Sequence, residues 1–174
     1  MTASSDQQAS AVEAIIFDID GVLTSGSIVY GPDGEWKIFN VQDGHGFKLA
    51  KRAGLKLGIL SGRASEASTR RAQELQVDVC EQGIKDKGAL LPDILGKLGV
   101  DAAKTCYVGD DVVDLPCMQI VGFPVAVENA VEEVKACALY TTVRRGGDGA
   151  AREVIELILK AKGLWSEVMN RYEG

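Results

Sequence analysis

The sequence predicts an α/β fold: a single Rossmann-like parallel sheet with helices on both faces. Short apolar runs alternate along the chain with longer runs of helical periodicity. Strands that alternate with helices form right-handed βαβ units, which build a parallel sheet covered on both sides. The expected strands are residues 14–17, 56–60, 77–80, 105–108, 124–127 and 139–141, and the expected helices are residues 44–53, 65–75, 87–98, 130–136 and 150–161.

Three residues support the expected helix ends. Ser65 suits the N-cap of the helix that follows it, because its hydroxyl can accept a hydrogen bond from a free backbone N–H group. Gly99 and Gly163 suit the left-handed position that commonly ends a helix.

One segment breaks the alternation soon after the first strand. Residues 26–30 and 35–40 flank the turn Gly31-Pro32-Asp33-Gly34, whose composition is typical of a β-hairpin. We expect this hairpin, about residues 26–40, to form a flap over the ends of the strands. The stretch between Asp20 and Ser61 has room for the hairpin and one helix, so we expect no separate cap domain.

Length and composition narrow the class of protein. The 174 residues fit one domain spanning the chain, and the net charge of −6 argues against a nucleic-acid partner. The longest apolar run, residues 120–127, is too short to cross a membrane, and the first eleven residues lack an apolar signal core. No cysteine lies in a C-x-x-C pair and there is one histidine, so we expect reduced thiols, no zinc site and a cytoplasmic protein.

Asp18 and Asp20 directly follow the first apolar run, in the motif Asp18-Ile19-Asp20-Gly21. Two carboxylates that face one point repel each other and favour a cation between them, and oxygen ligands alone suit magnesium better than zinc. One carboxylate can attack phosphorus, and the other can protonate the leaving alcohol. Taken alone, the motif also fits an ordinary Asp-Gly turn.

Three further elements lie at predicted strand ends or helix starts. They are Ser61-Gly62-Arg63, a lysine at position 85 or 87, and Gly109-Asp110-Asp111 with Asp114 beyond. A hydroxyl and backbone N–H groups can hold phosphate oxygens, a lysine can offset their charge, and two acids can complete a metal site. Singly, each also fits a structural role: a strand-to-helix turn, a surface lysine, or acids at a helix N-terminus.

In this order, the four elements resemble the haloacid dehalogenase superfamily of phosphatases, from about residue 14 to about residue 160. The resemblance implies that Asp18 is the nucleophile and Asp20 the general acid and base. It also implies a Mg²⁺ ion held by Asp18, Asp110 and the backbone carbonyl of Asp20. Asp111 would act on this ion indirectly, by contacting its ligands or through a water molecule. The phosphoryl group would be held by Ser61, Gly62 and Lys87.

The finer resemblance is to the 3-deoxy-D-manno-octulosonate 8-phosphate phosphatase family. It rests on the runs DIDGVLTSG, EWKIFNVQDGHG, ILSGR, EQGIKDK, YVGDD and RRGGDGAAREV. It implies a small anionic sugar phosphate as substrate and a homotetramer in which a neighbour's flap and C-terminal tail, about residues 163–174, cover each site. Arg63 and Arg71 are candidate contacts for the substrate's anionic groups, while the roles of His45 and Arg152 stay open.

Alternatives from the same and from other classes remain at this point. A 2-keto-3-deoxynonulosonate 9-phosphate phosphatase is the near alternative, although that group tends to have an acid where Arg63 stands. A phosphatase with an open site for proteins would be monomeric. A receiver domain carries its phosphorylated aspartate on a later strand, and a non-catalytic binding or assembly module of the same fold usually lacks one of the carboxylates that this chain keeps.

Overall fold

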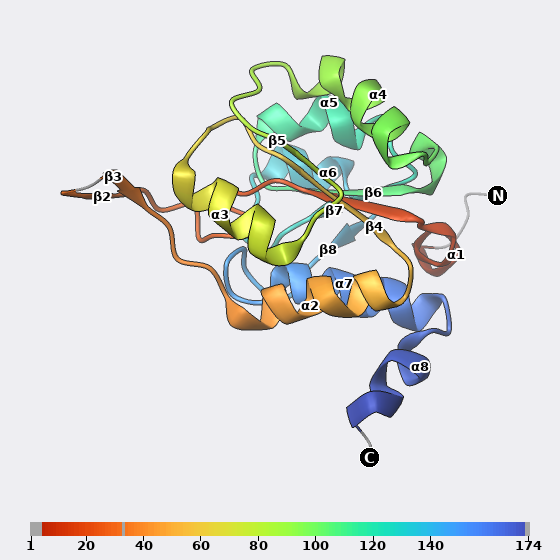
Figure 1. The fold of residues 1–174 in the computed structure, drawn as a ribbon. Helices are drawn as coiled ribbons and strands as arrows, with labels where there is room; N and C mark the ends of the chain where they lie inside the picture. Colours follow the sequence, from red (N-terminus) through yellow and green to blue (C-terminus); the bar gives the residue numbers. More distant parts are fainter. Residues whose placement is uncertain (1–4, 33, 173–174) are drawn as a thin grey trace.

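The structure, a computed structural model, describes residues 5–32 and 34–172. Its centre is a sheet in which all neighbouring strands are parallel, in the order β5-β4-β1-β6-β7-β8 (Figure 1). The strands are β1 (Ala14–Phe17), β4 (Lys56–Leu60), β5 (Val79–Glu81), β6 (Thr105–Gly109), β7 (Phe123–Ala126) and β8 (Tyr140–Thr141). The predicted α/β class with a parallel sheet is confirmed.

Helices cover both faces of the sheet (Figure 1). The helices are α1 (Ser5–Ala11), α2 (Val41–Arg52), α3 (Glu66–Leu75), α4 (Lys87–Leu98), α5 (Leu115–Met118), α6 (Glu132–Cys137), α7 (Ala150–Ala161) and α8 (Trp165–Met169). Both α1 and α2 pack against α7 on one face, while α4 and α6 pack against α5 on the other. Short 3-10 turns, η1 (Ala102–Lys104), η2 (Val112–Asp114) and η3 (Asn170–Tyr172), complete the described elements. No helix in the described ranges is both long and apolar enough to span a bilayer.

β1 occupies the middle of the sheet and sets the position of the site. All its residues are fully buried, as a strand covered on both faces requires. From β1 the chain runs outward to β4 and β5, then returns to the other side of β1 to form β6. Ligands bind at such a reversal, beyond the carboxyl ends of the strands. Phe17, the last residue of β1, pairs with Ile59 of β4 and Val108 of β6. Asp18 follows it and therefore lies beyond the carboxyl end of the strand.

The predicted hairpin is present. β2 (Val29–Gly31) pairs antiparallel with β3 (Gly34–Trp36), and the ribbon extends away from the body of the protein (Figure 1). Asp33 of the predicted turn lies outside the described residues. In the described part of the stretch from Asp20 to Ser61, the chain forms this hairpin, α2 and β4, as expected without a separate cap domain.

Several element boundaries differ from those expected, for local reasons. α2 begins three residues early, because the Asn40 side chain caps it by accepting hydrogen bonds from the N–H groups of Gln42 and Asp43. β5 lies one to two residues later than expected, and α6 begins at Glu132 instead of residue 130. Two predicted caps hold: Ser65 accepts from the N–H group of Ser68, and Gly99 ends α4 with φ +68°. Gly163 has the expected left-handed conformation, with φ +71°, but follows the C-cap of α7, which is Lys162.

Candidate active site

The turn that follows β1 carries the D-x-D-G motif. The N–H group of Asp18 donates to the carbonyl of Val108 at 3.1 Å, which extends the contact between β1 and β6 to the first carboxylate. Gly21 has φ +92°, a conformation that glycine adopts readily and other residues rarely. A Cβ atom on Gly21 would lie 1.9 Å from Oδ2 of Asp110. The glycine of the motif therefore lets the two acidic loops approach each other.

A buried lysine and three carboxylates meet at the ends of β1 and β6. Oxygen atoms of Asp18, Asp110 and Asp114 lie within 4.8 Å of one another. Lys87, the first residue of α4, places its Nζ 2.9 Å from Oδ2 of Asp18 and 2.7 Å from Oδ1 of Asp114. Of the two candidate lysines, Lys87 is the one in this cluster, and Lys85 lines the cavity above it.

Burial and charge shift the pKa values of this cluster. Burial raises the pKa of Asp18 to about 6; Asp114 adds to the shift and Lys87 opposes it. Burial also raises the pKa of Asp110 to about 8, with a further contribution from Asp18. For Lys87, burial favours a lower pKa, but the two carboxylates it contacts outweigh burial and the net shift is upward. The cluster therefore favours binding a proton or another cation.

Asp114 positions the other residues of the cluster through hydrogen bonds to both of its carboxylate oxygens. It is fully buried, and its Oδ1 accepts hydrogen bonds from the Tyr107 hydroxyl at 2.8 Å and from Lys87. Its Oδ2 accepts from the N–H groups of Asp110 at 3.0 Å and Asp111 at 3.4 Å. Both oxygens are thus engaged by protein donors, so Asp114 fixes the geometry of the loop after β6. The sequence placed Asp114 beside the G-D-D motif but gave it no role.

The donor set fits a divalent cation. Oδ1 of Asp110 is buried and has no hydrogen-bond partner among the described residues, as expected of an atom that binds a metal ion. When ionised, Asp18, Asp110 and Asp114 carry three negative charges against the single positive charge of Lys87, an excess that one divalent cation neutralises. Carboxylate and carbonyl oxygens are the ligands that magnesium prefers.

A cavity of about 500 Å³ opens over this cluster. It is lined by Asp18, Asp20, Gly26, Ile28, Ser61, Gly62, Arg63, Ile84, Lys85, Lys87, Asp110, Asp111 and Val113. The structure therefore brings together every predicted site residue except Arg71. Asp111 is exposed, and its carboxylate accepts from the N–H group of Val112 at 2.7 Å, which caps η2.

The turn after β4 carries Ser61, Gly62 and Arg63. The N–H group of Ser61 donates to the carbonyl of Glu81 at 2.9 Å, so the turn is anchored to β5. The Ser61 hydroxyl accepts from the N–H group of Arg63 at 3.4 Å and is almost fully buried beside the cavity. Gly62 lines the cavity, and its ideal Cβ position lies 3.7 Å from the Ile84 carbonyl oxygen and 4.0 Å from Cε of Lys87.

Two flap residues reach the site, which the sequence did not predict. Lys37 forms ion pairs with Asp20 and, at 3.1 Å, with Oε1 of Glu35. Glu35 in turn accepts from Nη2 of Arg63 at 2.5 Å. The hairpin was expected to lie over the site, but the sequence alone does not say which of its side chains face inward.

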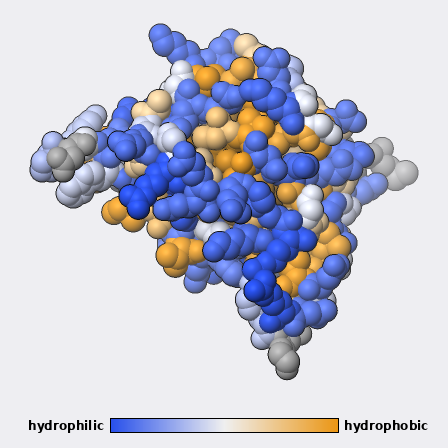
Figure 2. All heavy atoms as spheres, in the orientation of Figure 1, coloured by the Kyte–Doolittle hydropathy of each residue, from blue (hydrophilic) through white to orange (hydrophobic). Residues whose placement is uncertain are grey.

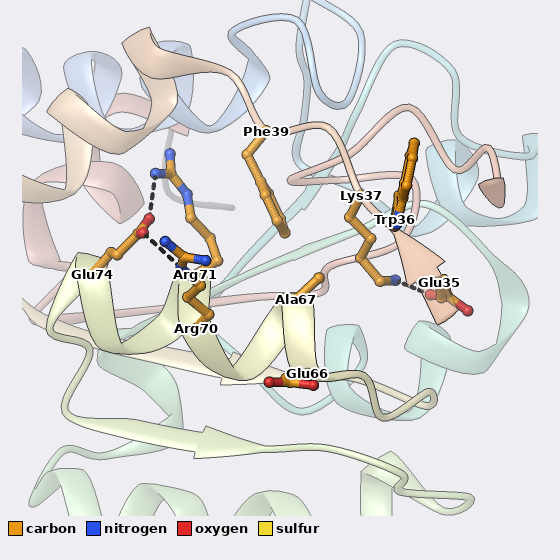
Figure 3. A pocket seen from close by; sticks show the side chains of 9 residues that line it. All are labelled: Glu35, Trp36, Lys37, Phe39, Glu66, Ala67, Arg70, Arg71 and Glu74. Atoms are coloured by element: carbon orange, nitrogen blue, oxygen red, sulfur yellow. Dashed lines mark hydrogen bonds and ion pairs between the residues drawn. The ribbon is translucent and has the colours of Figure 1, made fainter. Parts of the chain in front are cut away.

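Arg71, a candidate contact for the substrate's anionic groups, does not line this cavity. Its Nη2 donates to the carbonyl of Asn40 at 3.0 Å, and its guanidinium lies over the Phe39 ring. It lines a second hollow of about 400 Å³ between α3 and the flap, where Figure 3 shows it paired with Glu74. The structure thus gives Arg71 a role in joining α3 to the base of the flap.

His45 and Arg152 also lie outside the lining of the cavity. Nε2 of His45 is 3.0 Å from the Tyr172 hydroxyl, which ties α2 to the C-terminal η3. The Arg152 side chain pairs with Glu156 at 2.7 Å and lies over the Trp165 ring. Within one chain, both residues therefore connect α2 and α7 to the C-terminal segment.

A glycine-rich segment braces the turn after β1 from the side. The Asn129 amide donates to the carbonyl of Gly21 at 3.1 Å, and its oxygen accepts from the N–H group of Gly146 at 2.6 Å. The N–H group of Gly147 donates to the carbonyl of Val22 at 2.9 Å. A Cβ atom on Gly146 would lie 1.7 Å from the Gly21 carbonyl oxygen, so this close approach requires glycine.

The fold and the acidic cluster point to one class of enzyme, and comparison with known proteins agrees. Residues 76–154 match the sequence profile of haloacid dehalogenase-like hydrolases. A parallel sheet with paired aspartates at its point of reversal, facing a lysine and a second acidic loop, is suited to phosphoryl transfer through electrostatic stabilisation.

Curated relatives and solved structures narrow the class. The 3-deoxy-D-manno-octulosonate 8-phosphate phosphatase of Escherichia coli K12 is 38% identical over 161 residues, which cover 92% of this chain and 86% of the relative. The corresponding enzyme of Haemophilus influenzae is 37% identical, covering 90% of this chain and 88% of the relative.

Two solved structures agree with those relatives. That of the Moraxella catarrhalis phosphatase of the same name, in complex with magnesium, phosphate and a KDO molecule, superposes with a TM-score of 0.93 at 38% identity and covers 97% of both chains. That of the cobalt-bound Haemophilus influenzae phosphatase has a TM-score of 0.89 at 37% identity and covers 92% of this chain and 94% of the other. This chain belongs to the 3-deoxy-D-manno-octulosonate 8-phosphate phosphatase family and is a phosphoric monoester hydrolase.

Proposed function

We propose that the protein is a magnesium-dependent phosphatase that hydrolyses 3-deoxy-D-manno-octulosonate 8-phosphate to the free sugar acid and phosphate. The reaction would serve the synthesis of lipopolysaccharide precursors. The observation that carries this proposal is the buried cluster of Asp18, Lys87 and Asp110 at the end of β1, inside a cavity whose rim holds Arg63. We further propose that the chain is one phosphatase domain.

The metal would be held by the carboxylates of Asp18 and Asp110 and by the backbone carbonyl of Asp20, with Asp111 beside them. A bound Mg²⁺ would offset the negative charge of the carboxylates and of the phosphoryl oxygens. Oδ1 of Asp110, which is buried and finds no hydrogen-bond partner in the described part of the chain, supports this assignment. Because Asp114 is saturated by protein donors, its part is to hold the loop of Asp110 in place.

In the first step, a carboxylate oxygen of Asp18 attacks the phosphorus of the ester. The bond between phosphorus and the ester oxygen breaks, and the protonated carboxyl of Asp20 gives its proton to the leaving alcohol. The Ser61 hydroxyl, the main chain of Gly62 and Nζ of Lys87 hold the phosphoryl oxygens. Lys87 contacts Asp18 at 2.9 Å, so it lies where the charge of the transferring group develops.

In the second step, Asp20 acts as a base. Its carboxylate removes a proton from a water molecule, which attacks the phosphorus of the aspartyl phosphate. The bond between Asp18 and phosphorus breaks, which releases phosphate and restores the Asp18 carboxylate and the protonated carboxyl of Asp20. Oδ2 of Asp20 is buried without a hydrogen-bond partner among the described residues, so it is available for this exchange of protons.

Arg63 is the residue that we assign to the carboxylate of the sugar acid. Its side chain is 47% exposed at the rim of the cavity, and a guanidinium pairs with a carboxylate through two parallel hydrogen bonds. Arg71 is not included in this assignment within one chain, because it lies in the other hollow.

We also propose that the enzyme works in the cytoplasm as a homotetramer. Tyr30, Trp36 and Ile38 of the flap segment are 77%, 54% and 81% exposed, and Figure 2 shows hydrophobic surface between the hairpin and the body of the protein. Neighbouring subunits that cover this surface would add their flaps and C-terminal tails to sites where each chain's own Glu35 and Lys37 already lie. The four cysteines are all free, in keeping with a reducing compartment.

The test of this function is a comparison of substrates. Magnesium-dependent phosphate release would be measured from 3-deoxy-D-manno-octulosonate 8-phosphate, from 2-keto-3-deoxynonulosonate 9-phosphate and from a phosphopeptide. We expect the highest kcat/KM with the octulosonate ester. Preference for the nonulosonate ester or for the phosphopeptide would contradict the proposed substrate, and no release from any of them would contradict the catalytic function.

A further inference from the structure

In the flap segment, charged side chains face the protein and apolar side chains face solvent, the reverse of the usual arrangement. Side chains of an extended chain alternate between two faces. Glu35 and Lys37 face the body of the protein, with side chains only 14% and 3% exposed. Trp36 and Ile38 face outward. A strand in a monomeric protein normally buries its apolar face. Here the charged face is the buried one, which requires groups of opposite charge within the site to pair with it.

That partner is a pair of charges in the cavity, and together the four groups form a closed ring. Glu35 pairs with Arg63 at 2.5 Å and with Lys37 at 3.1 Å. Lys37 pairs with Asp20, and Nε of Arg63 lies 3.9 Å from Oδ2 of Asp20. Acids and bases alternate around the ring, so its net charge is zero. Figure 3 shows the ammonium group of Lys37 directed at the Glu35 carboxylate.

The ring occupies Arg63, the group that we assign to the substrate carboxylate. Hydrogen bonds from Arg63 and Lys37 lower the pKa of Glu35, so this carboxylate is an anion at neutral pH. It presents to Arg63 the same functional group that a sugar acid would present. A guanidinium that already bonds one carboxylate at 2.5 Å offers a second one a weaker site.

We propose that Glu35 is an internal competitor for the carboxylate end of the substrate, and that a bound sugar acid replaces it on Arg63. This inference rests on the proposed function, because it takes its carboxylate substrate from there. In the resting protein, Glu35 holds the flap on the cavity through Arg63. When the substrate carboxylate takes over that guanidinium, the flap is released from Arg63 while Lys37 still links it to Asp20.

The experiment compares Glu35→Gln with the wild type, Arg63→Ala and the double variant. Each protein would be assayed with the octulosonate ester and with 4-nitrophenyl phosphate, which has no carboxylate. We expect Glu35→Gln to lower the KM for the octulosonate ester, relative to that for nitrophenyl phosphate, roughly two- to fivefold, the range expected for one partly exposed ion pair. In the Arg63→Ala background, the same change should leave this ratio as it is.

Glu13→Gln provides a matched control for the change in charge. Glu13 pairs with Lys104 at 2.7 Å, and both side chains are about half exposed outside the cavity lining. This variant should show the wild-type ratio of KM values. An unchanged ratio of KM values in Glu35→Gln would overturn the competition, because Glu35 would then have no influence on Arg63. A higher ratio would also overturn it, because Glu35 would then orient Arg63 for the substrate. An equal fall in the Arg63→Ala background would also overturn it.

Failure of the proposed substrate would be recognised separately. In that case the wild type releases phosphate from nitrophenyl phosphate but not from the octulosonate ester. The competition is then judged by inhibition of nitrophenyl phosphate hydrolysis by free 3-deoxy-D-manno-octulosonate. Glu35→Gln should lower that inhibition constant roughly two- to fivefold, and an inhibition constant that is unchanged, or an absence of inhibition, would overturn the inference.

Discussion

Asp18 and Asp110 are held in surroundings that disfavour their ionised forms. Carboxyl groups in an unfolded chain titrate near pH 4, whereas the pKa values of these two rise to about 6 and about 8. Raised values mean that the stability these groups contribute is fully present below about pH 4 and is lost as the pH rises through 6 and 8. A cation that binds the ionised carboxylates restores it.

Stability should therefore depend on pH and magnesium together. The melting temperature would be measured by calorimetry between pH 5 and pH 8, with Mg²⁺ or with a chelator. We expect Mg²⁺ to raise the melting temperature more at pH 8 than at pH 5, because protons compete with the metal at the lower pH. Asp110→Asn should abolish most of this difference. An equal gain at both pH values would contradict the proposed metal site.

Lys87 and Asp114 differ in how far the sequence alone indicates their roles. A lysine at the first position of a helix opposes the helix dipole, which sets Lys87 apart from an ordinary surface lysine. Asp114 gave no such signal. Its role depends on η2, which turns the chain so that Oδ2 of Asp114 reaches the N–H group of Asp110. Spacing alone does not show that a short turn closes in this way.

At the scale of elements, the site depends on segments that carry none of its chemistry. Asn129 and the segment after Arg145 hold the carbonyl groups of Gly21 and Val22, which lie directly after Asp20. The loop after β7 and the loop before α7 therefore set the orientation of the main chain that follows the D-x-D motif. The sequence alone does not show which main-chain groups these glycines approach.

Gly146→Ala tests this brace. The added Cβ atom would lie 1.7 Å from the Gly21 carbonyl oxygen, so the turn after β1 must move. We expect a loss of about 1–3 kcal/mol in the free energy of unfolding, typical of overpacking, together with weaker Mg²⁺ binding measured by calorimetric titration.

Gly96→Ala is the matched control, because no atom of residues 5–32 or 34–172 outside its own helix backbone and chain neighbours lies within 4 Å of its ideal Cβ position in α4. It should gain about 0.5–1 kcal/mol, since alanine favours a helix interior more than glycine does. Wild-type stability and Mg²⁺ affinity in Gly146→Ala would show that the segment does not position the site.

Elements with strong local signals were predictable, and elements that depend on their neighbours were not. β1 and β4 match the expected strands because their apolar residues are buried on both faces of the sheet. The start of α2 is hard to predict, because the residues between Val41 and Phe47 are polar or glycine and the helix start depends on the side-chain cap at Asn40. The hairpin was recognised from its turn residues, but the facing of its side chains depends on contacts with distant loops.

At the scale of the whole molecule, the flap presents apolar side chains to solvent. Trp36 and Ile38 lie on the face opposite to the charges that meet Arg63 and Asp20. Exposed apolar surface of this kind marks an interaction site. The same strand therefore serves the site with one face and offers the other face to a neighbouring subunit.

Ile38→Lys tests the proposed assembly. Light scattering should give the wild type a mass of four chains of 18.5 kDa and the variant a smaller mass, because a charge buried in an interface is costly. Ile120→Lys is the control: Ile120 is 48% exposed two residues beyond the end of α5, and this variant should stay tetrameric. A monomeric wild type, or an Ile38→Lys variant of unchanged mass, would contradict the assembly.

The account stands or falls on Asp18 as the nucleophile. Its central claim is tested most directly by quenching the reaction with acid during turnover of a radiolabelled phosphate ester in the presence of Mg²⁺, and locating the label by peptide mapping. We predict covalent phosphate on Asp18 in the wild type, and a folded Asp18→Asn variant with neither label nor turnover. Continued phosphate release by Asp18→Asn, or label found on another residue, would contradict the account.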